Sequence, residues 1–267
     1  MSLRRATIVA CLTASLGTGV AAGAHAGELT VSAAASLQNA FREIGRRFEQ
    51  AHPGTTVRFN FAGSGPLLAQ LRKGAPVDVF ASADHDTMDR AVAEGLVTGA
   101  TRRDFASNAV VLVAPLQAPA NGAGASLSAL ADLRGARVRR IAVGQPRVVP
   151  AGAYTRRALQ AQGLWSALEP RLVYGDNVRQ VLSYVSRGEV DAGFVYRSDA
   201  LLDAARVRIV LTVPTEGLRG GRTIVVPALR AAGASRTIEL GDIRKVSSCQ
   251  RRNVAHAGSP ITSAGSW

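Results

Sequence analysis

From residue 29 onward, apolar residues follow two spacings that alternate along the chain. Short apolar or alternating runs predict strands, whereas apolar residues repeated every three or four positions predict helices. Residues 36–50 form the clearest helix, because Leu37, Phe41 and Phe48 fall on one face. Such alternation is typical of a mainly parallel sheet flanked by helices. The predicted elements are strands at residues 29–31, 57–61 and 77–81 and helices at residues 36–50, 64–73 and 88–94.

A second α/β unit is predicted over about residues 108–200. Residues 109–114 are almost continuously apolar, as expected for a strand buried on both faces. A later strand, residues 207–211, is expected to return to the first unit, and residues 224–229 are a further candidate strand. Between these strands, a loop is predicted at residues 115–126, helices at 127–133, 153–162 and 178–186, and strands at 139–143, 172–174 and 192–196.

The first 26 residues have the features of a secretory signal peptide. Arg4 and Arg5 precede a short, small and apolar stretch, and the Ala24–Ala26 segment fits an A-x-A cleavage pattern. No later segment approaches the ~18 continuous apolar residues that a membrane-spanning helix needs. We therefore expect an exported protein that is soluble once the signal peptide is removed.

Charge and composition argue against several kinds of partner, cross-link and cofactor. The chain of 267 residues carries a net charge of +13, but the excess is scattered and partly terminal, and aromatic residues are only 5%, so a nucleic-acid partner is not expected. Removal of the signal peptide leaves Cys249 as the single cysteine, which excludes an intramolecular disulfide. The histidines do not cluster, so the sequence predicts no transition-metal site and no cofactor.

Candidate chemistry lies at three turns where a predicted strand runs into a helix. Small residues surround Ser36 in the first turn and Ser64 in the second, and the third turn contains Ala151. At a helix start, backbone N–H groups lack intrahelical partners and the helix dipole favours negative charge. Because all three turns fall at the carboxyl ends of strands, they can form one anion site. Each serine taken alone is better explained as an ordinary helix N-cap.

Three other interpretations compete. A secreted serine hydrolase that uses Ser64 would need a histidine within reach, and the nucleophile-elbow pattern is incomplete because Ala62 stands where a glycine is required. Tyr196, which follows a buried strand, can be a core or hinge aromatic instead of a ligand-binding residue. A cluster of aspartates is better explained by helix caps than by a cation site; its members are Asp78, Asp84, Asp86 and Asp89.

Over about residues 28–213, the chain resembles the periplasmic molybdate-binding proteins of ABC importers. The resemblance is carried by AAASL, FAGSG, GAPVDVFASAD, VPAGAY, DNVR and GFVYRSDA, in the family's order and spacing. It implies a two-lobed periplasmic binding protein fold of type II, in which each lobe is a mixed, mainly parallel sheet flanked by helices. A tetrahedral oxyanion would bind between the lobes through residues that match the family's positions: Ser36, Ser64, Ala151, Val178 and Tyr196.

On this resemblance, residues 1–26 are a cleaved signal peptide, 27–106 with 204–230 form the first lobe, and 107–203 form the second. The lobes would close about hinges near residues 106–108 and 197–206. Residues 231–267 depart from the family, whose members usually end in a long helix, and we interpret this tail as the product of a frameshift near residues 220–230.

The expected function is capture of molybdate, and of tungstate, in the periplasm, followed by delivery to the membrane permease of an ABC importer. The protein is expected to be a monomer and not an enzyme, since nothing in the site needs to turn over. Sulfate, thiosulfate or phosphate remains open as an alternative ligand, and a sensor domain without transport remains open as an alternative role.

Overall fold

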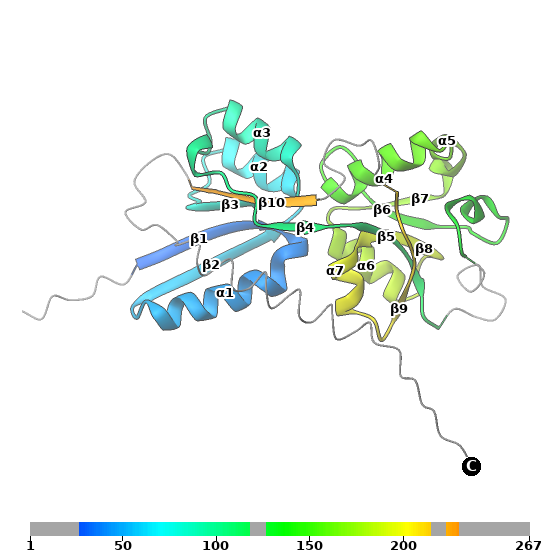
Figure 1. Cartoon of the computed structure of the whole chain (residues 1–267), viewed down its shortest axis with the longest axis horizontal. Coiled ribbons are helices and arrows are strands. Elements are labelled where there is room, and N and C mark those ends of the chain that lie inside the picture. The colour runs from blue at the N-terminus through cyan, green and yellow to red at the C-terminus, as the bar shows by residue number, and fades with distance from the viewer. Residues whose placement is uncertain (1–26, 118–126, 215–222, 230–267) are drawn as a thin grey trace, which may run out of the picture.

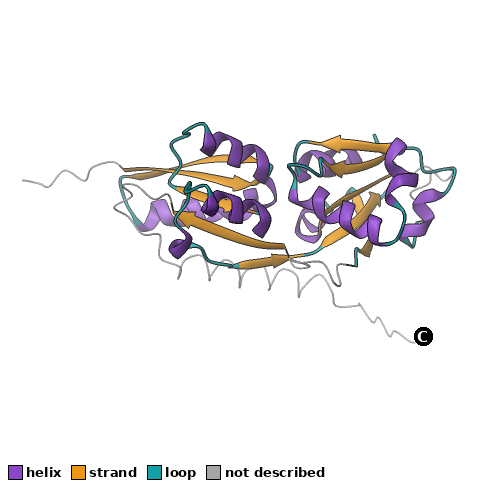
Figure 2. Cartoon of the chain, turned by 90° about the horizontal axis from the view of Figure 1, so that it is seen from above, coloured by secondary structure: helices purple, strands orange, loops and turns teal. Residues whose placement is uncertain are grey.

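The computed structural model describes residues 27–117, 127–214 and 223–229. Its strands form two five-stranded sheets, each flanked by helices, and the two resulting lobes lie side by side along the longest axis (Figure 1). Seen from above, one of the segments that link the lobes runs along one edge of the molecule (Figure 2). The predicted signal peptide and the predicted frameshifted tail, residues 231–267, lie outside the described residues.

The first sheet has the strand order β2-β1-β3-β10-β4. Its parallel part consists of β1 (Gly27–Ala34), β2 (Thr55–Ala62) and β3 (Val79–Ser82). Strand β10 (Thr223–Leu229) lies antiparallel between β3 and the short β4 (Ala106–Asn108). The sheet is therefore mixed and mainly parallel in its first half, as the alternation of strands and helices predicted.

The helices of the first lobe begin where its parallel strands end. A 3-10 helix η1 (Ala35–Leu37) leads from β1 into α1 (Gln38–Ala51), which buries Phe41 and Phe48 as its apolar stripe predicted. Helix α2 (Ser64–Arg72) follows β2, and α3 (His85–Ala93) follows β3. The carboxyl ends of the strands therefore meet the starts of three helices at one edge of the lobe.

The second sheet has the order β7-β6-β8-β5-β9. Strand β6 (Ile141–Gly144) pairs in parallel with β7 (Leu172–Gly175) and with β8 (Ala192–Tyr196). Strand β5 (Val110–Pro115) pairs antiparallel with β8 and with β9 (Val207–Thr212). Strands β5 and β8 are almost completely buried, which explains their continuous apolar sequence.

Helices α4 (Pro150–Ala161) and α6 (Val178–Ser186) follow β6 and β7 and confirm the helices expected there. The helix expected at 127–133 is a 3-10 helix, η4 (Leu130–Arg134). Two short helices were not predicted, α5 (Trp165–Leu168) and α7 (Arg197–Leu202). In the part of the chain that the structure describes, no helix is long and apolar enough to cross a membrane.

One domain boundary predicted from the sequence was wrong. Strand β9 was expected to return to the first lobe within residues 204–230, but it pairs with β5 in the second sheet. The chain returns to the first lobe only with β10. The first crossing lies between β4 and β5, next to the expected hinge at 106–108, but the second lies between β9 and β10, not at residues 197–206.

Candidate ligand-binding site

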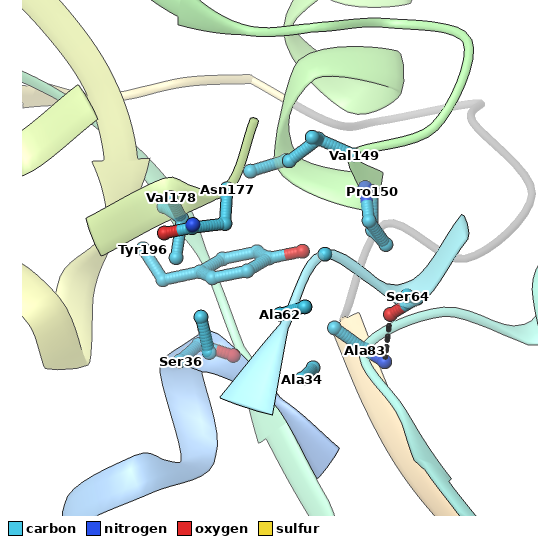
Figure 3. Close-up of a pocket in the computed structure, with 13 residues that line it drawn as sticks. Ala34, Ser36, Ala62, Ser64, Ala83, Val149, Pro150, Asn177, Val178 and Tyr196 are labelled. Carbon is cyan, nitrogen blue, oxygen red and sulfur yellow. Dashed lines mark hydrogen bonds between the residues drawn. The ribbon is translucent and has the colours of Figure 1, made fainter. Parts of the chain in front are cut away.

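A pocket lies between the two lobes, at the carboxyl ends of their parallel strands. Figure 3 shows turns from both lobes surrounding it, with the ring of Tyr196 reaching between them. It encloses about 200 Å³ of empty space, part of it open to solvent. All five site residues predicted from the sequence contribute to the lining, which consists of Ala34, Ala35, Ser36, Ala62, Gly63, Ser64, Ala83, Val149, Pro150, Ala151, Asn177, Val178 and Tyr196.

No charged side chain is among the described residues that line this pocket. Polar character comes instead from hydroxyl groups and from the starts of helices, since η1 and α2 of the first lobe and α4 and α6 of the second all begin there. Helix starts present free N–H groups and partial positive charge. The arrangement therefore suits an anion that is bound by neutral donors.

A hydrogen bond to Ser64 determines whether its hydroxyl can donate to a ligand or accept from it. The side chain is fully buried, and its Oγ accepts a hydrogen bond of 3.0 Å from the backbone N–H of Ala83 (Figure 3). Because a hydroxyl has a single proton and this bond uses an oxygen lone pair, the proton remains available to a ligand. Ser64 is thus prepared to donate.

The turn that carries Ala83 is itself held by polar side chains. Ser82 Oγ donates to Asp84 Oδ1 at 3.0 Å, and the same carboxylate oxygen accepts from the backbone N–H of Thr87 at 3.1 Å. Asp84 therefore caps α3, as the helix-cap interpretation of this aspartate predicted. Burial raises the pKa of Asp84 above its ordinary value, while the bonds from Thr87 and Ser82 oppose that rise.

The other aspartates of the predicted acidic cluster are dispersed among different partners. Asp78 accepts from the backbone N–H of Thr30 at 2.7 Å, Asp86 pairs with Arg157, and Asp89 pairs with Arg102. In the described part of the chain, no group of three His, Cys, Asp or Glu side chains could hold a metal ion. These carboxylates serve separate structural contacts.

At the start of α4, the backbone comes unusually close to the neighbouring strand. Pro150, the first helical residue, has no N–H, so Ala151 offers the first backbone donor at the pocket. The next residue, Gly152, leaves no room for a side chain, because an added Cβ would lie 1.8 Å from the carbonyl oxygen of Gly144. The glycine is therefore required to bring Ala151 into the lining.

The cap at the start of α6 leaves one backbone N–H group without a partner in the helix. Asn177 Oδ1 accepts from the backbone N–H groups of Arg179 and Gln180, at 3.0 and 3.1 Å. The N–H of Val178, the first residue of the helix, remains for a ligand. Sequence reasoning named Val178 but missed Asn177, although an asparagine directly before an apolar helical stripe is a recognisable N-cap signal.

Ser36 and Tyr196 complete the set of predicted donors. Ser36 lies in η1 and is partly exposed, whereas Tyr196 is 1% exposed at the end of β8. Their hydroxyl groups enter the pocket from different lobes (Figure 3). No histidine is among the described lining residues, so the pocket offers Ser64 no general base of the kind a serine hydrolase needs.

The lobes touch each other around this pocket. The backbone N–H of Gly65 in the first lobe donates to the carbonyl of Val148 in the second at 2.9 Å. Arg157 of α4 forms an ion pair with Asp86 of α3, and both side chains are substantially exposed. In the described conformation, these contacts join the two lobes beside the pocket.

Two α/β lobes that enclose a pocket of helix starts are typical of solute-binding proteins. Residues 29–239 match the bacterial extracellular solute-binding protein family, and the chain belongs to that family. It is 39% identical over 195 residues to the molybdate-binding protein ModA of Escherichia coli strain K12. The matched residues make up 72% of this chain and 74% of that protein.

Two solved structures have the same fold. The periplasmic molybdate-binding protein of Azotobacter vinelandii superposes with a TM-score of 0.65 at 23% identity, covering 88% of this chain and all of its own. The sulfate-binding protein SubI of Mycobacterium tuberculosis superposes with a TM-score of 0.67 at 15% identity, covering 88% of each chain. The predicted two-lobed α/β fold is confirmed.

Proposed function

We propose that this protein captures molybdate, and also tungstate, in the periplasm and delivers it to the permease of an ABC importer. The observation that carries the proposal is the pocket itself, whose donors are hydroxyls and helix starts without a charged lining residue. Relatives that bear the name molybdate-binding protein support the choice of ligand. The protein acts as a monomeric carrier without a cofactor, and no catalytic group is assigned to the pocket.

Each donor has a defined part. The hydroxyls of Ser36, Ser64 and Tyr196 donate to the oxyanion together with the backbone N–H groups of Ala151 and Val178. Ser64 is oriented for this by its bond from Ala83, and the N–H of Val178 is left over by the Asn177 cap, so these donors are preorganised. Preorganised donors need little rearrangement on binding, which favours affinity.

Ligand size is the basis of selectivity. Molybdate, tungstate and sulfate are tetrahedral dianions, but Mo–O and W–O bonds are longer than S–O bonds. Donors fixed to helix starts and strand ends cannot follow a smaller anion without moving whole elements. Sulfate would leave some donors unsatisfied, at about 1–3 kcal/mol each, and two such losses at the middle of that range correspond to several hundredfold. Phosphate carries a proton at neutral pH, and no carboxylate is among the described lining residues to accept it.

Isothermal titration calorimetry of the purified protein against molybdate, tungstate, sulfate, thiosulfate and phosphate tests the proposal. We expect molybdate and tungstate to bind with similar affinity and at least about a hundredfold more tightly than sulfate. Displacement of molybdate by an equal concentration of sulfate would reject the proposal in favour of a sulfate-binding protein, which the structural similarity to SubI makes the nearest alternative.

A further inference from the structure

Arg179 links three segments, at or beside the pocket, that are far apart in the sequence. It directly follows Val178 at the start of α6. Its Nε lies 2.6 Å from Asp199 Oδ1, and its Nη2 donates a long hydrogen bond of 3.5 Å to the backbone carbonyl of Ser36. Ser36 belongs to the first lobe, so this guanidinium contacts both lobes at once.

The carboxylate partner is deeply buried. Asp199 is 0% exposed in the first turn of α7, three residues after Tyr196, whereas the side chain of Arg179 retains 23% exposure. Moving an ion pair out of water costs about as much as the attraction between its charges returns, so stability alone gives little reason to keep one. Its position behind Val178, Tyr196 and Ser36 suggests a role in the geometry of the site.

We propose, on the basis of the proposed function, that Arg179 is a positioning residue for oxyanion binding. Asp199 fixes the guanidinium beside the start of α6, and the guanidinium holds the Ser36 turn of the first lobe against it. Closure of the lobes then places the Ser36 hydroxyl and the Val178 N–H on the same anion. The positive charge also lies just behind a pocket whose described lining residues are uncharged.

A second arginine provides a matched control, because Arg157 of α4 also reaches the first lobe, where it pairs with Asp86 of α3. The exposed fractions of these side chains are 37% and 56%, so water screens the pair. Neither residue lines the pocket. If any arginine contact between the lobes supported binding equally, Arg157→Met would weaken molybdate binding as much as Arg179→Met.

The experiment compares the full-length mature protein with Arg179→Met, Asp199→Asn, the double variant and Arg157→Met. Molybdate affinity is measured by calorimetry, and the ligand-free melting temperature is measured alongside. We expect Arg179→Met to bind at least about tenfold more weakly and to melt earlier, because it leaves the Asp199 carboxylate buried without its cation. The double variant replaces that carboxylate and should recover much of the melting temperature while its affinity stays at least about tenfold reduced.

Asp199→Asn keeps Arg179 and an amide oxygen that can still accept a hydrogen bond from its Nε, so it should bind molybdate within about threefold of wild type. Arg157→Met should bind like wild type. The proposal is overturned if the double variant recovers wild-type affinity together with stability, or if Arg179→Met binds molybdate like wild type, since either result means that the pair only supports the fold. A wild-type protein that does not bind molybdate refutes the proposed function instead.

Discussion

The two pocket serines should respond differently to the same substitution. Ser36→Ala removes a partly exposed hydroxyl, so the anion loses one donor. Ser64→Ala removes such a donor too, but it also deletes the acceptor for the Ala83 N–H, a buried bond of 3.0 Å. One side chain therefore serves the ligand alone, and the other serves both the ligand and the fold.

The magnitudes follow from these contacts. A hydrogen bond to a charged group contributes about 1.5–3 kcal/mol, so each variant should bind molybdate about ten- to a hundredfold more weakly. A buried N–H left without an acceptor costs about 1–3 kcal/mol. For a chain of this size, each kcal/mol shifts the melting temperature by about 2–4 °C. Ser64→Ala should therefore lower the ligand-free melting temperature by several degrees, while Ser36→Ala leaves it within about a degree.

Calorimetry with molybdate and a thermal melt of each ligand-free variant measure the two effects separately. Ser186→Ala is a suitable control, because its hydroxyl donates to the carbonyl of Ser183 within α6 and takes no part in the pocket. If both pocket variants kept wild-type affinity, the assignment of these serines as donors would be refuted. If Ser36→Ala destabilised the ligand-free protein as much as Ser64→Ala, the separation of roles argued from the Ala83 bond would be wrong.

Three further outcomes are expected. Gly152→Ala should lower both the melting temperature and the molybdate affinity, measured as above, because its Cβ would meet the Gly144 carbonyl at 1.8 Å and push the start of α4 away from the pocket. Burial raises the pKa of Asp199 to about 7, although Arg179 opposes the rise, so the folded state holds this proton more tightly than the unfolded state does. Stability from this group is therefore full in acid and is lost as pH rises from about 4 to about 7; chemical denaturation should show wild type losing up to about 1.4 kcal/mol per pH unit relative to Asp199→Asn. Small-angle scattering should show a smaller radius of gyration with molybdate than without it, and an unchanged profile at saturation would contradict closure of the lobes.

The sequence predicted those elements that have enough length to display a period. Helix α1 has 14 residues and α6 has nine, so their apolar stripes repeat over at least two turns. Helices α5 and α7 have four and six residues, too few for a stripe to be recognised. Periodicity thus located most of the fold and missed the shortest helices.

Which sheet a strand joins is a different kind of information. Strand β9 was correctly located but assigned to the wrong lobe, because alternation of apolar residues reports a buried face and carries nothing about the neighbour across it. Its position depends on the antiparallel register with β5, in which Val113 pairs with Ile209 and Leu112 with Leu211. The error in the second hinge followed directly from this misassignment.

The same distinction between local pattern and long-range contact applies to the site. Turns of small residues at strand ends are visible in the sequence, and the pocket brings together the residues that they and the family resemblance indicated. The contacts that orient them join distant segments: Ala83 to Ser64, and Arg179 to both Asp199 and Ser36. No local spacing encodes such pairs, so the donors could be predicted while the residues that orient them could not.

The same reasoning accounts for an uncharged pocket in a chain of net charge +13. An arginine inside the pocket would attract sulfate, phosphate and molybdate alike, since charge does not distinguish these anions by size. Donors fixed to helix starts and buried turns respond to the distance at which an oxygen lies, and hydrogen bonds weaken steeply when that distance is wrong. With the Arg179 guanidinium held behind the lining by Asp199, positive charge can favour any anion while the geometry of the donors selects among them. Replacing a lining residue with arginine should therefore narrow the difference between molybdate and sulfate affinity, because a flexible arginine can follow the smaller anion whereas the fixed donors cannot; calorimetry with both anions measures this difference.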